Sequence, residues 1–152
     1  MPSIGRPAGL TLAAASVIID KALEKGRELG LHPLTVAVLD AGGQLKALKR
    51  EDGSSLLRPE IAFGKAWGVL GMGFGGRELA RRAAQSPQFI QALTAASGGR
   101  IVPAAGGVLI RDHDRTILGA VGISGDTSDK DEICAVHGIA AAGLVADTGD
   151  PG

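Results

Sequence analysis

The chain of 152 residues carries 16 Lys+Arg against 16 Asp+Glu, so its formal net charge is zero, and 45% of its residues are hydrophobic. With one Trp, three Phe and no Tyr, it lacks the basic surface and the stacking groups typical of nucleic-acid binding, and its apolar runs are too short to span a bilayer. Its single cysteine excludes an internal disulfide. Together with the lack of a signal-peptide pattern, this predicts a cytoplasmic protein consisting of one domain, residues 1–152.

The first half of the chain predicts a helix, a hairpin and a second helix. Residues 11–29 have the helical period of apolar positions, with Thr11 as the N-cap. "LTVAVLD" (34–40) and "QLKALKRE" (44–51) read as two strands that turn at "AGG". "SLLRPEIAFGKAWGVLGMG" then predicts a helix that begins near Arg58 or Pro59.

The second half predicts short helices over 77–85 and 86–97, with Ser86 and Pro87 at the start of the latter. Residues 98–125 predict a short strand and then a second hairpin that turns at "DHDR". A last helix begins near Ser128, which would form a capping box with Asp131. Residues 1–9 and 146–152 are expected to be flexible ends. Hairpins require antiparallel pairing, so the predicted class is α+β, an antiparallel sheet with helices packed on it.

The last helix contains the one cysteine and a histidine three residues later, in "DEICAVHGIAAAGL" (131–144). We expect its inward stripe to run through Ile133, Val136/His137, Ala140 and Leu144, which places Cys134 one turn before His137. A structural zinc site would need four ligands, and the chain has no second such pair. Non-covalent haem needs only one axial ligand and an apolar slot. An ordinary core thiol and histidine explain the pair equally well.

Three charged residues could bind a ligand. Lys65 lies in an apolar helix beside Trp67, where a lowered pKa would make it a base or nucleophile; it could instead pair with Glu60 or Asp52. Arg50 and Asp52 in "KREDG" could orient a carboxylate, or simply face solvent. "GMGFGG" (71–76) fits a dinucleotide-binding pattern but follows a helix, so we read it as a loop.

Six segments in this order resemble the GlcG/HbpS family, the former domain of unknown function 336, from about Leu10 to Leu144. They are "LTLAAASVIIDKAL", "VAVLDAGGQLKALKREDG", "EIAFGKAWG", "GGRIVPAAGGVLI", "GAVGISG" and "DEICAVHGIAAAG". The resemblance implies a profilin-like domain with about five antiparallel strands that assembles into homo-oligomers. Relatives include haem-binding and haem-degrading proteins and others in catabolic pathways, a few of them similar to lyases. The chain departs from the family pattern at Leu109, at "DHDR" and at Trp67.

The leading functional hypothesis is a small-ligand-binding protein with haem as its ligand. Trp67 and the last helix would line an apolar slot. Lys65 or Arg50 would meet a propionate, and His137 or Cys134 would meet the iron.

Two alternatives remain open. In an enzyme of the lyase or isomerase type, Arg50 and Lys65 would hold a small carboxylate, and Asp52 or Asp131 would move a proton. The backbone amides of Gly106 and Gly107 could then stabilise an oxyanion. The third hypothesis is a structural oligomeric module with the last helix as its interface.

Overall fold

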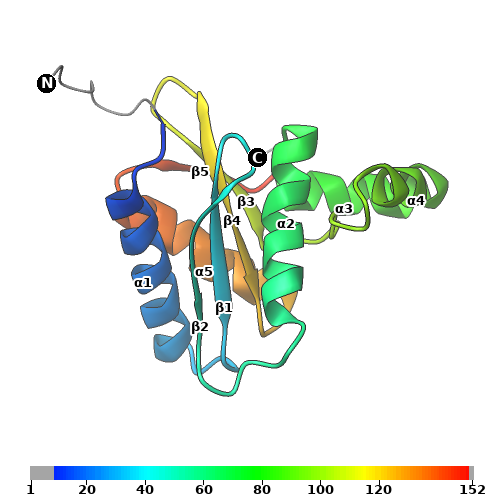
Figure 1. Ribbon diagram of the computed structural model, residues 1–152. Coiled ribbons are helices and arrows are strands. Elements are labelled where there is room, and N and C mark those ends of the chain that lie inside the picture. The colour runs from blue at the N-terminus through cyan, green and yellow to red at the C-terminus, as the bar shows by residue number, and fades with distance from the viewer. Residues whose placement is uncertain (1–8, 151–152) are drawn as a thin grey trace, which may run out of the picture.

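The computed structural model describes residues 9–150, and within them the chain forms three layers (Figure 1). A five-stranded antiparallel sheet has the order β2-β1-β4-β3-β5, with α1 and α5 on one face and α2 on the other. The elements are α1 (Leu12–Glu28), β1 (Thr35–Asp40), β2 (Leu45–Arg50), α2 (Arg58–Met72), α3 (Gly76–Gln85), α4 (Pro87–Ala96), β3 (Gly107–Arg111), β4 (Ile117–Ser124), α5 (Ser128–Ala141) and β5 (Val145–Asp147). The predicted α+β class and single antiparallel sheet are confirmed.

The two faces of β1 are buried in different cores. Val36 and Val38 pack in the cluster that contains the buried side chains of α1 and α5, whereas Leu39 belongs to the cluster under α2. A strand covered on both faces carries no polar side, which is why "TVAVL" lacks the alternation of a half-exposed strand. At the start of α1 the Thr11 hydroxyl accepts a hydrogen bond from the Ala14 amide at 3.1 Å, as predicted for an N-cap.

The α2 helix packs directly on the backbone of β4 at Gly122, where the strand has no side chain. A Cβ atom on Gly122 would collide with the carbonyl oxygen of Ala62 in α2. Ala66 and Val69 then fill the space between this helix and the strands. Beyond the end of α2, α3 and α4 form a helical hairpin at one side of the molecule (Figure 1).

Two differences from the predicted elements concern strands. The short strand expected before β3 does not form, because the Val102 amide donates to the Gly64 carbonyl of α2 at 3.2 Å instead of to a sheet partner. The chain end, expected to be flexible from Ala146, contributes β5, and Asp147 accepts a hydrogen bond from Arg111 Nε at 2.9 Å. Residues 1–8 and 151–152 of the expected flexible ends lie outside the described part. None of the helices within residues 9–150 is long and apolar enough to cross a membrane.

Candidate functional site

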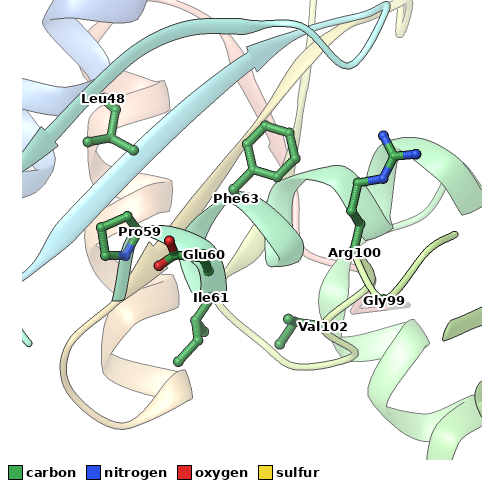
Figure 2. A pocket seen from close by; sticks show the side chains of 8 residues that line it. All are labelled: Leu48, Pro59, Glu60, Ile61, Phe63, Gly99, Arg100 and Val102. Carbon is green, nitrogen blue, oxygen red and sulfur yellow. The ribbon is translucent and has the colours of Figure 1, made fainter. Parts of the chain in front are cut away.

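A groove of about 450 Å³ runs along the outer side of α2 (Figure 2). Its walls come from β2, from the first half of α2, and from the segment between α4 and β3. The lining residues are Leu48, Pro59, Glu60, Ile61, Phe63, Gly99, Arg100 and Val102. Most of these side chains are apolar. A mostly apolar cavity of this size, with few polar groups, is typical of small-ligand sites, which span roughly 300–1,000 Å³.

Glycines shape the wall opposite α2. A Cβ on Gly64 would lie 2.5 Å from both the Arg100 carbonyl oxygen and a methyl of Val102, so only glycine lets this segment pack on the helix. Gly98 and Gly99 have φ angles of 69° and 82°, a conformation that side chains disfavour. The chain can therefore turn sharply after α4 and bring Arg100 to the rim of the groove.

The guanidinium of Arg100 is held in one orientation without an acidic partner. It lies 4.6 Å from the centroid of the Trp67 ring, and its Nε donates to the Ser97 carbonyl at 2.9 Å. Within residues 9–150 it forms no ion pair with a carboxylate. Figure 2 shows Phe63 between Leu48 and Arg100. The groove thus combines an aromatic face with a positioned cation that is free to meet an anion.

Trp67 does not line this groove, although its ring lies against the Arg100 guanidinium. Its ring packs in the clusters under α2 and beside α3 and α4, whereas the buried side chains of α5 belong to the cluster on the opposite face of the sheet. The expected slot between Trp67 and the last helix therefore does not form, because the sheet separates them.

Cys134 and His137 point in different directions. Cys134 is fully buried between α1 and the sheet, and burial raises the pKa of its thiol to about 11. His137 is exposed, as is Ile133. The predicted inward stripe was wrong by one position, since the buried residues of α5 are Asp131, Glu132, Cys134, Ala135, Gly138 and Ile139. No three His, Cys, Asp or Glu side chains within residues 9–150 gather as a metal site.

Lys65 is buried, but its partner is Asp131 and neither Glu60 nor Asp52. The Lys65 amine donates to the Asp131 carboxylate at 3.3 Å and to the Ile123 carbonyl at 2.9 Å, with side-chain exposures of 5% for Lys65 and 0% for Asp131. Asp131 also accepts a hydrogen bond from the Asp126 amide. The capping box predicted with Ser128 is absent, because the N-cap of α5 is Thr127 and Ser128 is the first residue of the helix. Burial lowers the pKa of Lys65 and raises that of Asp131 to about 6.

The raised pKa of Asp131 predicts an unusual pH dependence of stability. An unfolded aspartate has a pKa of about 3.9, so between pH 7 and pH 5 the folded state takes up a proton that the unfolded state does not. We therefore expect this group to raise the free energy of unfolding by about 1–2 kcal/mol as the pH falls from 7.5 to 5. Urea unfolding of wild type and Asp131→Asn at both pH values measures this. Parallel pH dependence in the two proteins would show that Asp131 does not titrate in this range.

Arg50 and Asp52 line a different pocket, of about 420 Å³, together with Arg27, Pro33 and Glu51. Arg50 donates to the Ser54 carbonyl at 2.8 Å. Lys65 does not line this pocket, so Arg50 and Lys65 are not brought to one small carboxylate.

Gly106 and Gly107 lie at the start of β3 under Lys65, and neither lines the groove along α2 or the pocket of Arg50. A Cβ on Gly106 would lie 3.0 Å from the Lys65 amine, and one on Gly107 would lie 2.5 Å from the Lys65 carbonyl oxygen. Their lack of side chains therefore makes room for Lys65.

A family model described as "Haem degrading protein HbpS-like" matches residues 10–140. The chain belongs to this family. This HbpS-like chain is 29% identical over 128 residues to the "uncharacterized 15.0 kDa protein in dhaT-dhaS intergenic region" of Citrobacter freundii. The alignment covers 84% of this chain and 88% of the relative.

Solved structures support the same assignment for the HbpS-like chain. A complex of PduOC with haem is similar with a TM-score of 0.81 and 26% identity, over 94% of this chain and 100% of PduOC. A double mutant of HbpS from Streptomyces reticuli is similar with a TM-score of 0.75 and 28% identity, over 92% and 95% of the two chains. The resemblance predicted from the sequence is thereby confirmed.

The sequence reasoning missed the residues that line the groove, Phe63 and Arg100 above all. The signal for Arg100 was weak but present: it follows two consecutive glycines and precedes the apolar "IVP". Nothing local in the sequence indicates that this segment packs on Gly64 of α2.

Proposed function

We propose that this protein binds a flat, largely apolar ligand with carboxylate groups in the groove along α2, and that haem is this ligand. The observation that carries the proposal is the pairing of an apolar groove with the Arg100 guanidinium, which has no carboxylate partner within residues 9–150. Support comes also from the family and from PduOC, whose solved structure contains haem.

The residues fit the organic part of haem. Leu48, Phe63 and Val102 would cover the macrocycle, and Arg100 would meet a propionate through charge-assisted hydrogen bonds. When bound, haem supplies an iron centre that can bind small ligands or exchange electrons. The groove offers that iron none of the usual axial ligands, because its eight lining residues include no His, Cys, Met or Tyr.

Replacing Arg100 with alanine is expected to weaken haem binding about 10- to 100-fold, because a hydrogen bond to a charged group contributes roughly 1.5–3 kcal/mol. Phe63→Ala should weaken it to a similar extent by removing the aromatic face. The measurement is a haem titration followed by the Soret band. Arg115→Ala is the charge control, since this exposed arginine lies in the β3–β4 turn outside the groove.

The same titration on Cys134→Ser and His137→Ala tests the sequence-based iron ligands. We expect both to bind haem as wild type does, because Cys134 is enclosed in the core and His137 is exposed on the other side of the sheet from the groove. If either variant lost haem binding while Arg100→Ala bound haem as wild type does, the groove would not be the haem site.

We also propose, from the family resemblance, that the protein forms homo-oligomers in the cytoplasm. Sedimentation with and without haem tests the assembly. An oligomer that binds no haem and turns over no small carboxylate would favour the structural-module hypothesis.

A further inference from the structure

We infer that the groove along α2 recognises the tetrapyrrole ring and its carboxylates, and not the iron, so that metal-free porphyrins belong to the same ligand class as haem. This inference rests on the proposed function and makes its ligand class more specific. It follows from a disagreement between the site and the ligand that the family suggests: the groove suits a porphyrin, but its side chains do not suit haem iron.

The side chains that usually ligate haem iron in proteins are His, Cys, Met and Tyr, and the chain has no Tyr. Within residues 9–150, each candidate lies outside the groove. Cys134 and Met72 pack in two other clusters. His113 lies in the β3–β4 turn, where its Nε2 is 3.0 Å from the Gly143 carbonyl oxygen. His32 and His137 are exposed, near the end of α1 and on α5.

Among the residues that the structure describes, Glu60 is the only one with a carboxylate that lines the groove. It is not among the usual haem ligands, and its negative charge repels a second carboxylate nearby. The charges of the groove therefore direct the carboxylates of a porphyrin toward Arg100, at the other wall.

The contacts that remain available are the same for a porphyrin with or without metal. Phe63 offers a ring face for stacking on the macrocycle, and Leu48 and Val102 cover further apolar area. Arg100 is already fixed by Trp67 and by the Ser97 carbonyl, so little side-chain freedom is lost when a carboxylate binds. Binding should accordingly depend on the ring and the carboxylates.

The test is a pair of titrations of the full chain, one with ferric haem and one with metal-free protoporphyrin. Trp67 is the only tryptophan of the chain and stacks against Arg100, so quenching of its fluorescence reports ligand binding for both. We expect the two dissociation constants to agree within about tenfold. Arg100→Ala should weaken both, and protoporphyrin dimethyl ester, which lacks the free carboxylates, should bind wild type about as weakly as protoporphyrin binds Arg100→Ala.

The outcomes separate the two proposals. If haem binds but protoporphyrin binds more than about tenfold more weakly, the inference is overturned and the proposed haem binding stands. The iron would then contribute more than about 1.4 kcal/mol to the binding free energy. Binding of neither compound would contradict the proposed function and the inference with it. Haem and protoporphyrin could also bind equally well, with neither affinity changed in Arg100→Ala or Phe63→Ala. The porphyrin would then bind elsewhere, and the inference for this groove would be overturned.

Discussion

Replacing Lys65 with alanine is expected to lower the free energy of unfolding by about 3–5 kcal/mol. The substitution leaves the Asp131 carboxylate, whose side chain is 0% exposed, without its cation. It also leaves the Ile123 carbonyl without the donor that Lys65 supplies at 2.9 Å. Both groups would then remain buried with fewer hydrogen bonds than they need. Urea unfolding at pH 7.5, where Asp131 of the wild type is ionised, measures the loss.

Two comparisons make this result specific. The double variant Lys65→Met/Asp131→Asn removes both charges and should recover much of the lost stability, because the cost arises from one unpaired buried charge. Lys21→Ala removes a lysine from an exposed pair with Glu24, 3.0 Å apart, and should change stability by less than about 1 kcal/mol. If Lys65→Ala cost no more than Lys21→Ala, the buried pair would not contribute to stability as we argue.

The position of this pair suggests why a lysine is buried here at all. Gly122 pairs with Gly107, the first residue of β3, and the next residue of β4 is Ile123. The Ile123 amide still donates to Gly106, while its carbonyl accepts from Lys65. Had β3 begun one residue earlier, a backbone amide would have donated to the Ile123 carbonyl, and Lys65 supplies this hydrogen bond instead. Asp131 balances the positive charge of Lys65.

The sequence predicts the local parts of the fold well. Both hairpins, at 40–44 and at 112–115, lie where turn residues separate runs of apolar residues. Thr11 caps α1, and α4 begins at Pro87 as expected. Each of these features depends on residues within a few positions of one another, so helix and strand propensity, turn chemistry and periodicity are sufficient to predict it.

The features that the sequence does not predict depend on partners far along the chain. β5 has three residues and forms only because β3 offers an edge with Arg111 to pair with Asp147. Lys65 and Asp131 are 66 residues apart. In α5, Gly138 rather than a large side chain faces α1, because a Cβ there would meet the carbonyl of Ile18. An inward stripe drawn through large apolar residues therefore selects the wrong face of this helix.

The same reasoning explains why the groove was missed while Lys65 and Arg50 were singled out. Sequence reasoning selects charged residues in apolar surroundings, and Lys65 is one, but its environment is a buried ion pair. Arg100 gains its role only from the ring of Trp67 and from the packing of its segment on Gly64. Gly64 on α2 thus sets the shape of the groove, and the arginine proposed to bind the ligand, Arg100, comes from the segment between α4 and β3.

Replacing Gly122 with alanine is expected to destabilise the fold by about 2–4 kcal/mol. The added Cβ would overlap the Ala62 carbonyl oxygen and lie 2.8 Å from the Ala66 amide, and both atoms are backbone of α2, so the whole helix must move away from β4. Because the groove is built on α2, porphyrin binding should weaken in the same variant. Thermal unfolding and the porphyrin titration measure the two effects.

The matched control for Gly122 is Gly71, which also belongs to α2 but is exposed and has only a Trp67 ring atom, 3.8 Å away, near the position of a new Cβ. Gly71→Ala should leave stability unchanged or raise it by up to about 1 kcal/mol, because alanine favours a helix over glycine. Opposite signs for the two variants would show that contact with the strand, and not glycine content, keeps α2 in place. A Gly122→Ala protein as stable as wild type would mean that α2 can shift at little cost, and the groove would then have to be regarded as adjustable.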